Sequence, residues 1–138
     1  MRKRNGILLQ LAQEMQDALK DLQTINNRIN SLADLEKDPL TLRAARDAAF
    51  VAIQSAMDMG NRIIATEGYR KPETYRDIFS VLEEKGLLTP ELSNKLKDLA
   101  GFRNALVHFY WKFQRERLLK FLKEDYVVLE KFLKKVLE

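Results

Sequence analysis

The sequence of 138 residues has no cysteine and a single histidine, His108. The lack of cysteine excludes disulfides, thiolate zinc sites and cysteine nucleophiles, and one histidine excludes a metal site with several histidines in one chain. Only five glycines and three prolines are present, so neither a disordered nor a fibrous chain is expected. No apolar run approaches the ~20 residues that span a bilayer. We therefore expect a soluble cytoplasmic protein. No cofactor is expected.

The net charge of +4 is unevenly distributed along the chain. The first 69 residues carry equal numbers of acidic and basic side chains, whereas residues 112–138 carry eight basic and five acidic ones. A basic C-terminal segment is compatible with a phosphate-bearing partner. An ordinary solvated helix face explains the same charge equally well.

Apolar residues recur at the 3-4 spacing of helices along most of the chain. The first such seam runs from Leu8 to Leu32, the second from Leu42 to Ile63 and the last from Leu119 to Val136, with a shorter amphipathic stretch over 75–82. Helix boundaries are also marked, because a capping residue followed by proline typically begins a helix and glycine often ends one. The predicted boundary residues are Asp38-Pro39, Gly68, Gly86 and Thr89-Pro90.

These patterns predict an all-α protein with one domain over residues 1–138. Long antiparallel helices joined by short loops would form an up-down bundle of about four main helices plus a short helix. A simple coiled coil is the weaker alternative, because Pro72, Gly86 and Pro90 interrupt the repeat.

The segment 101–111 concentrates polar side chains on one side of a predicted helix. At about 100° per residue, Arg103, Asn104, His108 and Tyr110 share one arc, while the opposite arc holds Ala105, Leu106 and Phe109. A bundle helix needs only its apolar stripe, so this clustering indicates a functional face. Each residue taken alone also has an ordinary explanation: a surface histidine, a solvated arginine, or a half-buried tyrosine with its hydroxyl outward.

Asp58 is a further candidate, because it lies in a helical segment between apolar neighbours. A carboxylate in such a place is costly unless it is paired. Arg103 and Arg62, four residues further along the same segment, are equally plausible partners.

The spacing Arg103-x4-His108-x-Tyr110, together with the blocks 52–61, 75–79 and 99–104, resembles the HepT-like branch of the HEPN superfamily of ribonuclease toxins. The resemblance covers roughly residues 40–138. It implies a HEPN-like helical homodimer that acts as a metal-independent endoribonuclease on RNA. It also implies a minimal nucleotidyltransferase as the antitoxin partner, which transfers AMP to the tyrosine of the motif, here Tyr110.

The chemistry of the residues agrees with this implication. Metal-independent RNA cleavage needs proton transfer and positive charge at the phosphate, for which His108 and Arg103 are suited. Asn104 is a supporting residue and Asp58 a secondary candidate. Because each chain has one histidine, a two-fold dimer would bring two into one cleft. The alternative is a non-catalytic module that binds a nucleotide or docks the nucleotidyltransferase, and a purely structural dimer fits the motif least.

Overall fold

A computed structural model of the chain describes residues 6–107 and 112–138. For Lys112 and Phe113 it describes the backbone and not the side chains. Every regular element in these two ranges is helical, which confirms the all-α prediction. The elements are α1 (Gly6–Asn26), α2 (Leu32–Glu36), α3 (Pro39–Glu67), α4 (Tyr75–Glu84), α5 (Pro90–Val107), α6 (Lys112–Lys120), the π-helical segment η2 (Phe121–Asp125) and α7 (Tyr126–Val136).

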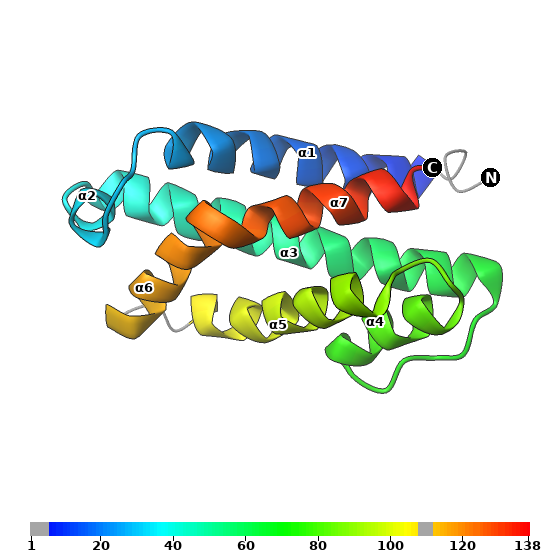
Figure 1. Cartoon of the computed structure of the whole chain (residues 1–138). Helices are drawn as coiled ribbons and strands as arrows, with labels where there is room; N and C mark the ends of the chain where they lie inside the picture. The colour runs from blue at the N-terminus through cyan, green and yellow to red at the C-terminus, as the bar shows by residue number, and fades with distance from the viewer. Residues whose placement is uncertain (1–5, 108–111) are drawn as a thin grey trace.

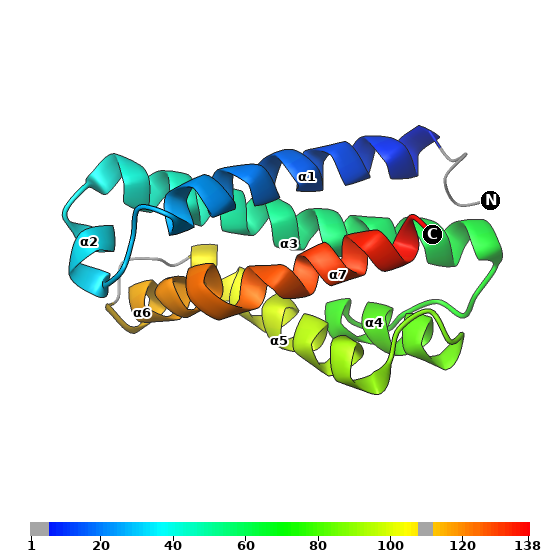
Figure 2. The ribbon, with the colours of Figure 1, turned by 45° about the horizontal axis from the view of Figure 1, so that its top comes forward.

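The long helices run along a common axis, with α3 in the centre (Figure 1). Helix α3 contacts every other α-helix, and α4 packs beside α5 on the opposite side of α3 from α1. A second view shows the same neighbours, with α7 lying across α3 between α1 and α5 (Figure 2). The helices α1, α3 and α6–α7 correspond to the three apolar seams, and α5 begins at the predicted boundary Thr89-Pro90. These are the four main helices, and α4 is the predicted short one.

Small residues allow α3 to occupy the centre. Five of its alanines are buried, and a Cβ added at Gly60 would lie 2.5 Å from the side chain of Ile78 on α4. This close approach brings α4 and the loop before it against the C-terminal half of α3. Aromatic contacts fill the wider parts of the core, for instance the perpendicular pair Phe79 and Phe132 with ring centroids 6.0 Å apart.

The predicted helix boundaries are confirmed at four places. Asp38 caps α3 by accepting from the Leu40 amide at 3.1 Å, and Thr89 accepts from the Leu92 amide at the start of α5. Gly68, which follows α3, has φ 70°, and Gly86, shortly after α4, has φ 76°, a conformation that glycine adopts without strain.

The first helix is shorter than its apolar seam predicts. The seam extends to Leu32, but α1 ends at Asn26, and the chain then turns before Ser31 caps the short helix α2. Ile29 is buried although it lies in this turn, because the turn folds back onto the bundle. The apolar residues of the seam therefore keep the helical spacing across the break between α1 and α2.

Candidate functional site

Arg103 lies on the side of α5 that faces α3 and α4, at the edge of the bundle. The buried stripe of α5 includes Leu99, Phe102 and Leu106, which turns Arg103 to a half-buried position. Asn104 is exposed, so the described part of the predicted polar face, Arg103 and Asn104, does lie at or near the surface.

The Arg103 guanidinium is fixed by two hydrogen bonds to neutral amides. Its Nε donates to Gln54 Oε1 on α3 at 2.8 Å, and its Nη1 donates to Asn104 Oδ1 at 3.1 Å. Two aromatic rings also lie against it: the Cζ atom is 5.3 Å from the ring centre of Phe50 on α3 and 5.2 Å from that of Tyr75 on α4. Both distances are within the range of cation–π attraction. Three helices thus hold the Arg103 cation, and no carboxylate of residues 6–107 or 112–138 forms an ion pair with it.

Asp58 reaches Arg103 through Gln54. The Gln54 Nε2 donates to Asp58 Oδ1 at 2.9 Å, one helical turn along α3. Because an ionised carboxylate only accepts hydrogen bonds, this contact turns the amide nitrogen towards Asp58 and the amide oxygen towards Arg103. In the described part of the chain neither Arg103 nor Arg62 forms an ion pair with Asp58, so the bridging amide takes the place of both expected partners.

Sequence reasoning missed Phe50, Gln54 and Tyr75. The spacing 50-54-58 puts Phe50, Gln54 and Asp58 on one stripe of α3, which was a usable signal. Nothing in the local pattern shows that this stripe meets α5 at Arg103, 49 residues later.

The last described turn of α5 is also held from α3. Arg46 donates from Nε to the Leu106 carbonyl at 2.7 Å and from Nη2 to the Val107 carbonyl at 3.2 Å. A cation at the carbonyl end of a helix is favourable. Arg43, Arg46 and Phe50 help to line a cavity of about 310 Å³ at this point. The motif residues His108 and Tyr110 follow directly in the sequence and lie outside the described residues.

A second arginine network fixes the loop between α3 and α4. Arg70 donates to both Asp77 oxygens, at 2.7 and 2.9 Å, and to Glu84. The hydrogen bonds from Arg70 lower the pKa of Asp77 to about 2 and also lower the pKa of Glu84, while the two carboxylates raise the pKa of Arg70. Asp77 additionally accepts from the Glu73 amide, and Thr74 caps α4. This loop is tied to α4 at several points.

Within the described ranges, no group of three or more His, Asp or Glu side chains is placed to hold a metal ion. No helix among the described residues has both the length and the apolar character to cross a membrane.

The sequence model of the family described as "Ribonuclease HepT-like" matches residues 15–136. The chain belongs to the HepT-like ribonuclease family. A candidate RNase of Archaeoglobus fulgidus is 28% identical over 118 residues, which cover 86% of this chain and 89% of that protein. The mRNA nuclease HepT of Shewanella oneidensis is 35% identical over 57 residues, 41% of this chain and 43% of the relative.

A solved structure shows that this HepT-like chain has the HEPN fold. The tri-AMPylated HEPN toxin of Shewanella oneidensis, in complex with its MNT antitoxin, superposes with a TM-score of 0.84. The match is 20% identical and covers 96% of this chain and 97% of that one. The predicted family and fold are therefore confirmed.

Proposed function

We propose that this protein is the endoribonuclease toxin of a toxin–antitoxin pair. The observation that carries the proposal is the half-buried Arg103 guanidinium, which amides and aromatic rings hold while no carboxylate in the described part of the chain pairs with its charge. Membership of the HepT-like ribonuclease family and its relative named as an mRNA nuclease support RNA as the substrate.

Arg103 and His108 are the proposed catalytic residues. The guanidinium binds non-bridging phosphate oxygens and stabilises the added negative charge when the 2′-oxygen attacks phosphorus. Imidazole at near-neutral pH can take the proton from the 2′-hydroxyl or give one to the 5′-oxygen as the P–O5′ bond breaks. Asn104 supports Arg103 through its amide oxygen, and Asp58 acts through Gln54 as a positioning residue.

A homodimer would complete this chemistry. One chain offers a single histidine for two proton transfers. A two-fold axis beside α5 would bring a second His108 and a second Arg103 into the same cleft, so that one histidine acts as base and the other as acid.

Control by adenylylation is the second part of the proposal. In the superposed relative, the toxin is AMPylated and bound to an MNT antitoxin. We place the acceptor on this chain at Tyr110: its phenol oxygen attacks the α-phosphorus of ATP in a nucleotidyltransferase partner, and pyrophosphate leaves. The attached AMP adds negative charge near Arg103 and blocks RNA. Since RNA and ATP are both cytoplasmic, the pair would act there.

The proposal is tested by RNA cleavage with purified wild type, Arg103→Ala and His108→Ala, with Arg28→Ala as the control at an exposed arginine outside the site. We expect each site variant to lose about 10²-fold or more in rate with unchanged helicity, since each removes one transition-state interaction. Wild-type rates in both site variants would refute the assignment. A folded wild type that does not cleave RNA but binds the nucleotidyltransferase would instead identify a docking module.

A further inference from the structure

A cavity of about 560 Å³ lies beside the Arg103 site, between α3, α4 and the loop that joins them. Asn61, Tyr75, Ile78 and loop residues 71–74 line it. Tyr75 belongs both to this cavity and to the Arg103 site, because it is a lining residue of the cavity and its ring centre lies 5.2 Å from the guanidinium carbon of Arg103. The volume is within the range of small-ligand pockets, about 300–1,000 Å³.

We propose that this cavity binds an unpaired base of the RNA whose phosphate Arg103 holds. The inference rests on the proposed ribonuclease function and extends it to how the substrate strand is read.

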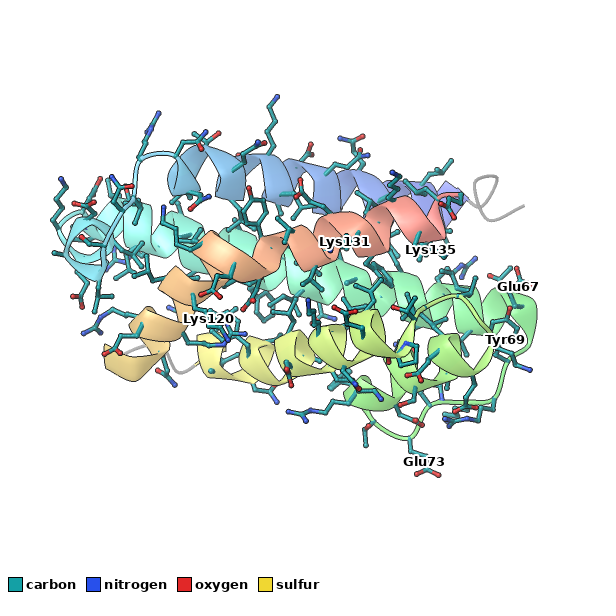
Figure 3. The ribbon with its side chains drawn as sticks, viewed as in Figure 1. Glu67, Tyr69, Glu73, Lys120, Lys131 and Lys135 are labelled. Atoms are coloured by element: carbon teal, nitrogen blue, oxygen red, sulfur yellow. The ribbon has the colours of Figure 1, made fainter. Side chains whose placement is uncertain are left out.

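The chemistry of the lining fits a nucleobase. Tyr75 is 53% exposed and offers an aromatic surface for stacking, the usual way in which proteins bind single-stranded bases. The Asn61 amide is exposed at the cavity and has both a donor and an acceptor for a base edge. Lys71, also in the lining, supplies a positive charge for the phosphate backbone of the RNA. Glu73 is the acidic lining residue, and Figure 3 shows its side chain pointing outward from the loop.

The position along α3 fits a strand that passes Arg103. Asn61 lies seven residues after Gln54 on α3, which is about 10 Å along the helix axis. Because Gln54 holds Arg103, this span is short enough for one RNA strand to contact both Arg103 and Asn61.

The cavity is also built before RNA arrives. Arg70 ties the loop to α4 through Asp77 and Glu84, and Asp77 accepts from the Glu73 amide inside the lining segment. Arg70 offsets one of the two negative charges of this pair, and neither Asp77 nor Glu84 is among the residues that line the cavity. A preformed pocket loses less entropy on binding than one that must be ordered.

The decisive experiment measures base binding without cleavage. A short 2′-O-methyl RNA carrying one 2-aminopurine cannot be cut by 2′-oxygen attack, and its fluorescence falls when the base stacks. We expect quenching with wild type and with Tyr75→Phe, and loss of quenching with about tenfold weaker binding for Tyr75→Leu. Equal quenching by Tyr75→Leu, or none by wild type at any position of the label, would overturn the proposal.

Asn61→Ala separates the cavity from the Arg103 site, because Asn61 makes none of the Arg103 contacts. With cleavable RNA we expect KM to rise about fivefold or more, with kcat little changed and the preference among cleavage sites altered. The matched control is Asn94→Ala, at an exposed asparagine of α5 outside the cavity, which should leave all three unchanged. An Asn61→Ala variant that behaves like this control would refute base recognition.

The two assays keep the proposals apart. If wild type quenches the label but never cleaves RNA, the base site stands and the ribonuclease function fails. If wild type cleaves with Arg103 dependence and does not quench, the ribonuclease function stands and the base site fails.

Discussion

Two arginines of this chain are held in opposite ways. Arg70 donates to Asp77 and Glu84, so its charge is balanced by two carboxylates. Arg103 donates to the amides of Gln54 and Asn104 and lies against two rings, so its position is fixed while its charge remains. The first arrangement serves to join a loop to a helix. The second suits a phosphate, because a cation already paired with carboxylates attracts an anion much less.

The difference comes from where each carboxylate stands. Asp77 and Glu84 reach Arg70 directly, whereas Asp58 is kept one amide away from Arg103. Through Gln54, Asp58 helps to orient the Arg103 guanidinium without placing its negative charge in contact with it. We infer that this inserted amide is what separates a structural arginine from a functional one in this fold.

The largest expected effect is on Arg103 itself. Arg103→Lys keeps the positive charge but lacks the planar fork that bonds Gln54 and Asn104 while facing a phosphate. We expect kcat for RNA cleavage to fall about 10²-fold or more. Arg70→Lys, with the same change in the other network, should lower kcat far less. Equal losses of kcat at the two positions would show that Arg103 and Arg70 do not differ in function.

Gln54→Glu should convert the Arg103 site towards the Arg70 arrangement. The substitution keeps the shape of the side chain but places a carboxylate on the Arg103 guanidinium. We therefore expect kcat to fall about tenfold, which is less than the loss expected when Arg103 itself is replaced. Steady-state cleavage with folded variants measures it.

Gln13→Glu is the matched control for this change. Gln13 donates to Asp17 at 2.9 Å, four residues along α1, as Gln54 does to Asp58 on α3. The control therefore creates the same carboxylate pair without an arginine, and its activity should be that of wild type. If Gln54→Glu is as active as Gln13→Glu, the neutral amide has no electrostatic role.

Much of the fold follows from local sequence. The seams of α3 and α7 and the boundary residues Asp38, Gly68 and Thr89 were all predictable, because capping and periodicity act within a few residues. The end of α1 and the π-helical turn Phe121–Asp125 were not predicted, since buried apolar residues keep their spacing through both irregularities.

The candidate site was predictable only in part. Arg103 and Asn104 do lie on the accessible side of α5, as the helical spacing predicts. Their partners Gln54, Phe50 and Tyr75 come from α3 and α4, and only the packing of these helices, set by small residues such as Gly60, brings them to Arg103. Roles for His108 and Tyr110 remain predictions from the motif.

Arg70→Ala should act on stability more than on chemistry. It leaves Asp77 and Glu84 without their cation and frees the loop before α4, so we expect the Tm to fall by about 2 °C, the scale of a surface ion-pair network. Thermal unfolding followed by circular dichroism measures this. The control is Lys95→Ala, which removes a single exposed pair with Glu91 and should change the Tm less. A Tm loss no larger than that of the control would contradict a joining role for Arg70.

The smallest expected effect is the acid dependence of the same network. The folded pKa of Asp77 is about 2, below its ordinary value of 3.8, and that of Glu84 is also lowered. Lowered carboxyl pKa values contribute stability above the unfolded values, and this contribution is lost as the pH falls from about 5 towards 2. Wild type should therefore lose Tm more steeply across this range than Arg70→Ala, in which the cation that lowers both pKa values is gone.

Asp38, whose pKa is lowered by its own hydrogen bonds with Thr41 and the Leu40 amide, is unchanged in both proteins and supplies the common background. Parallel Tm curves for the two proteins between pH 5 and 2 would show that Arg70 does not stabilise the ionised carboxylates, and the contrast with Arg103 would lose its electrostatic basis.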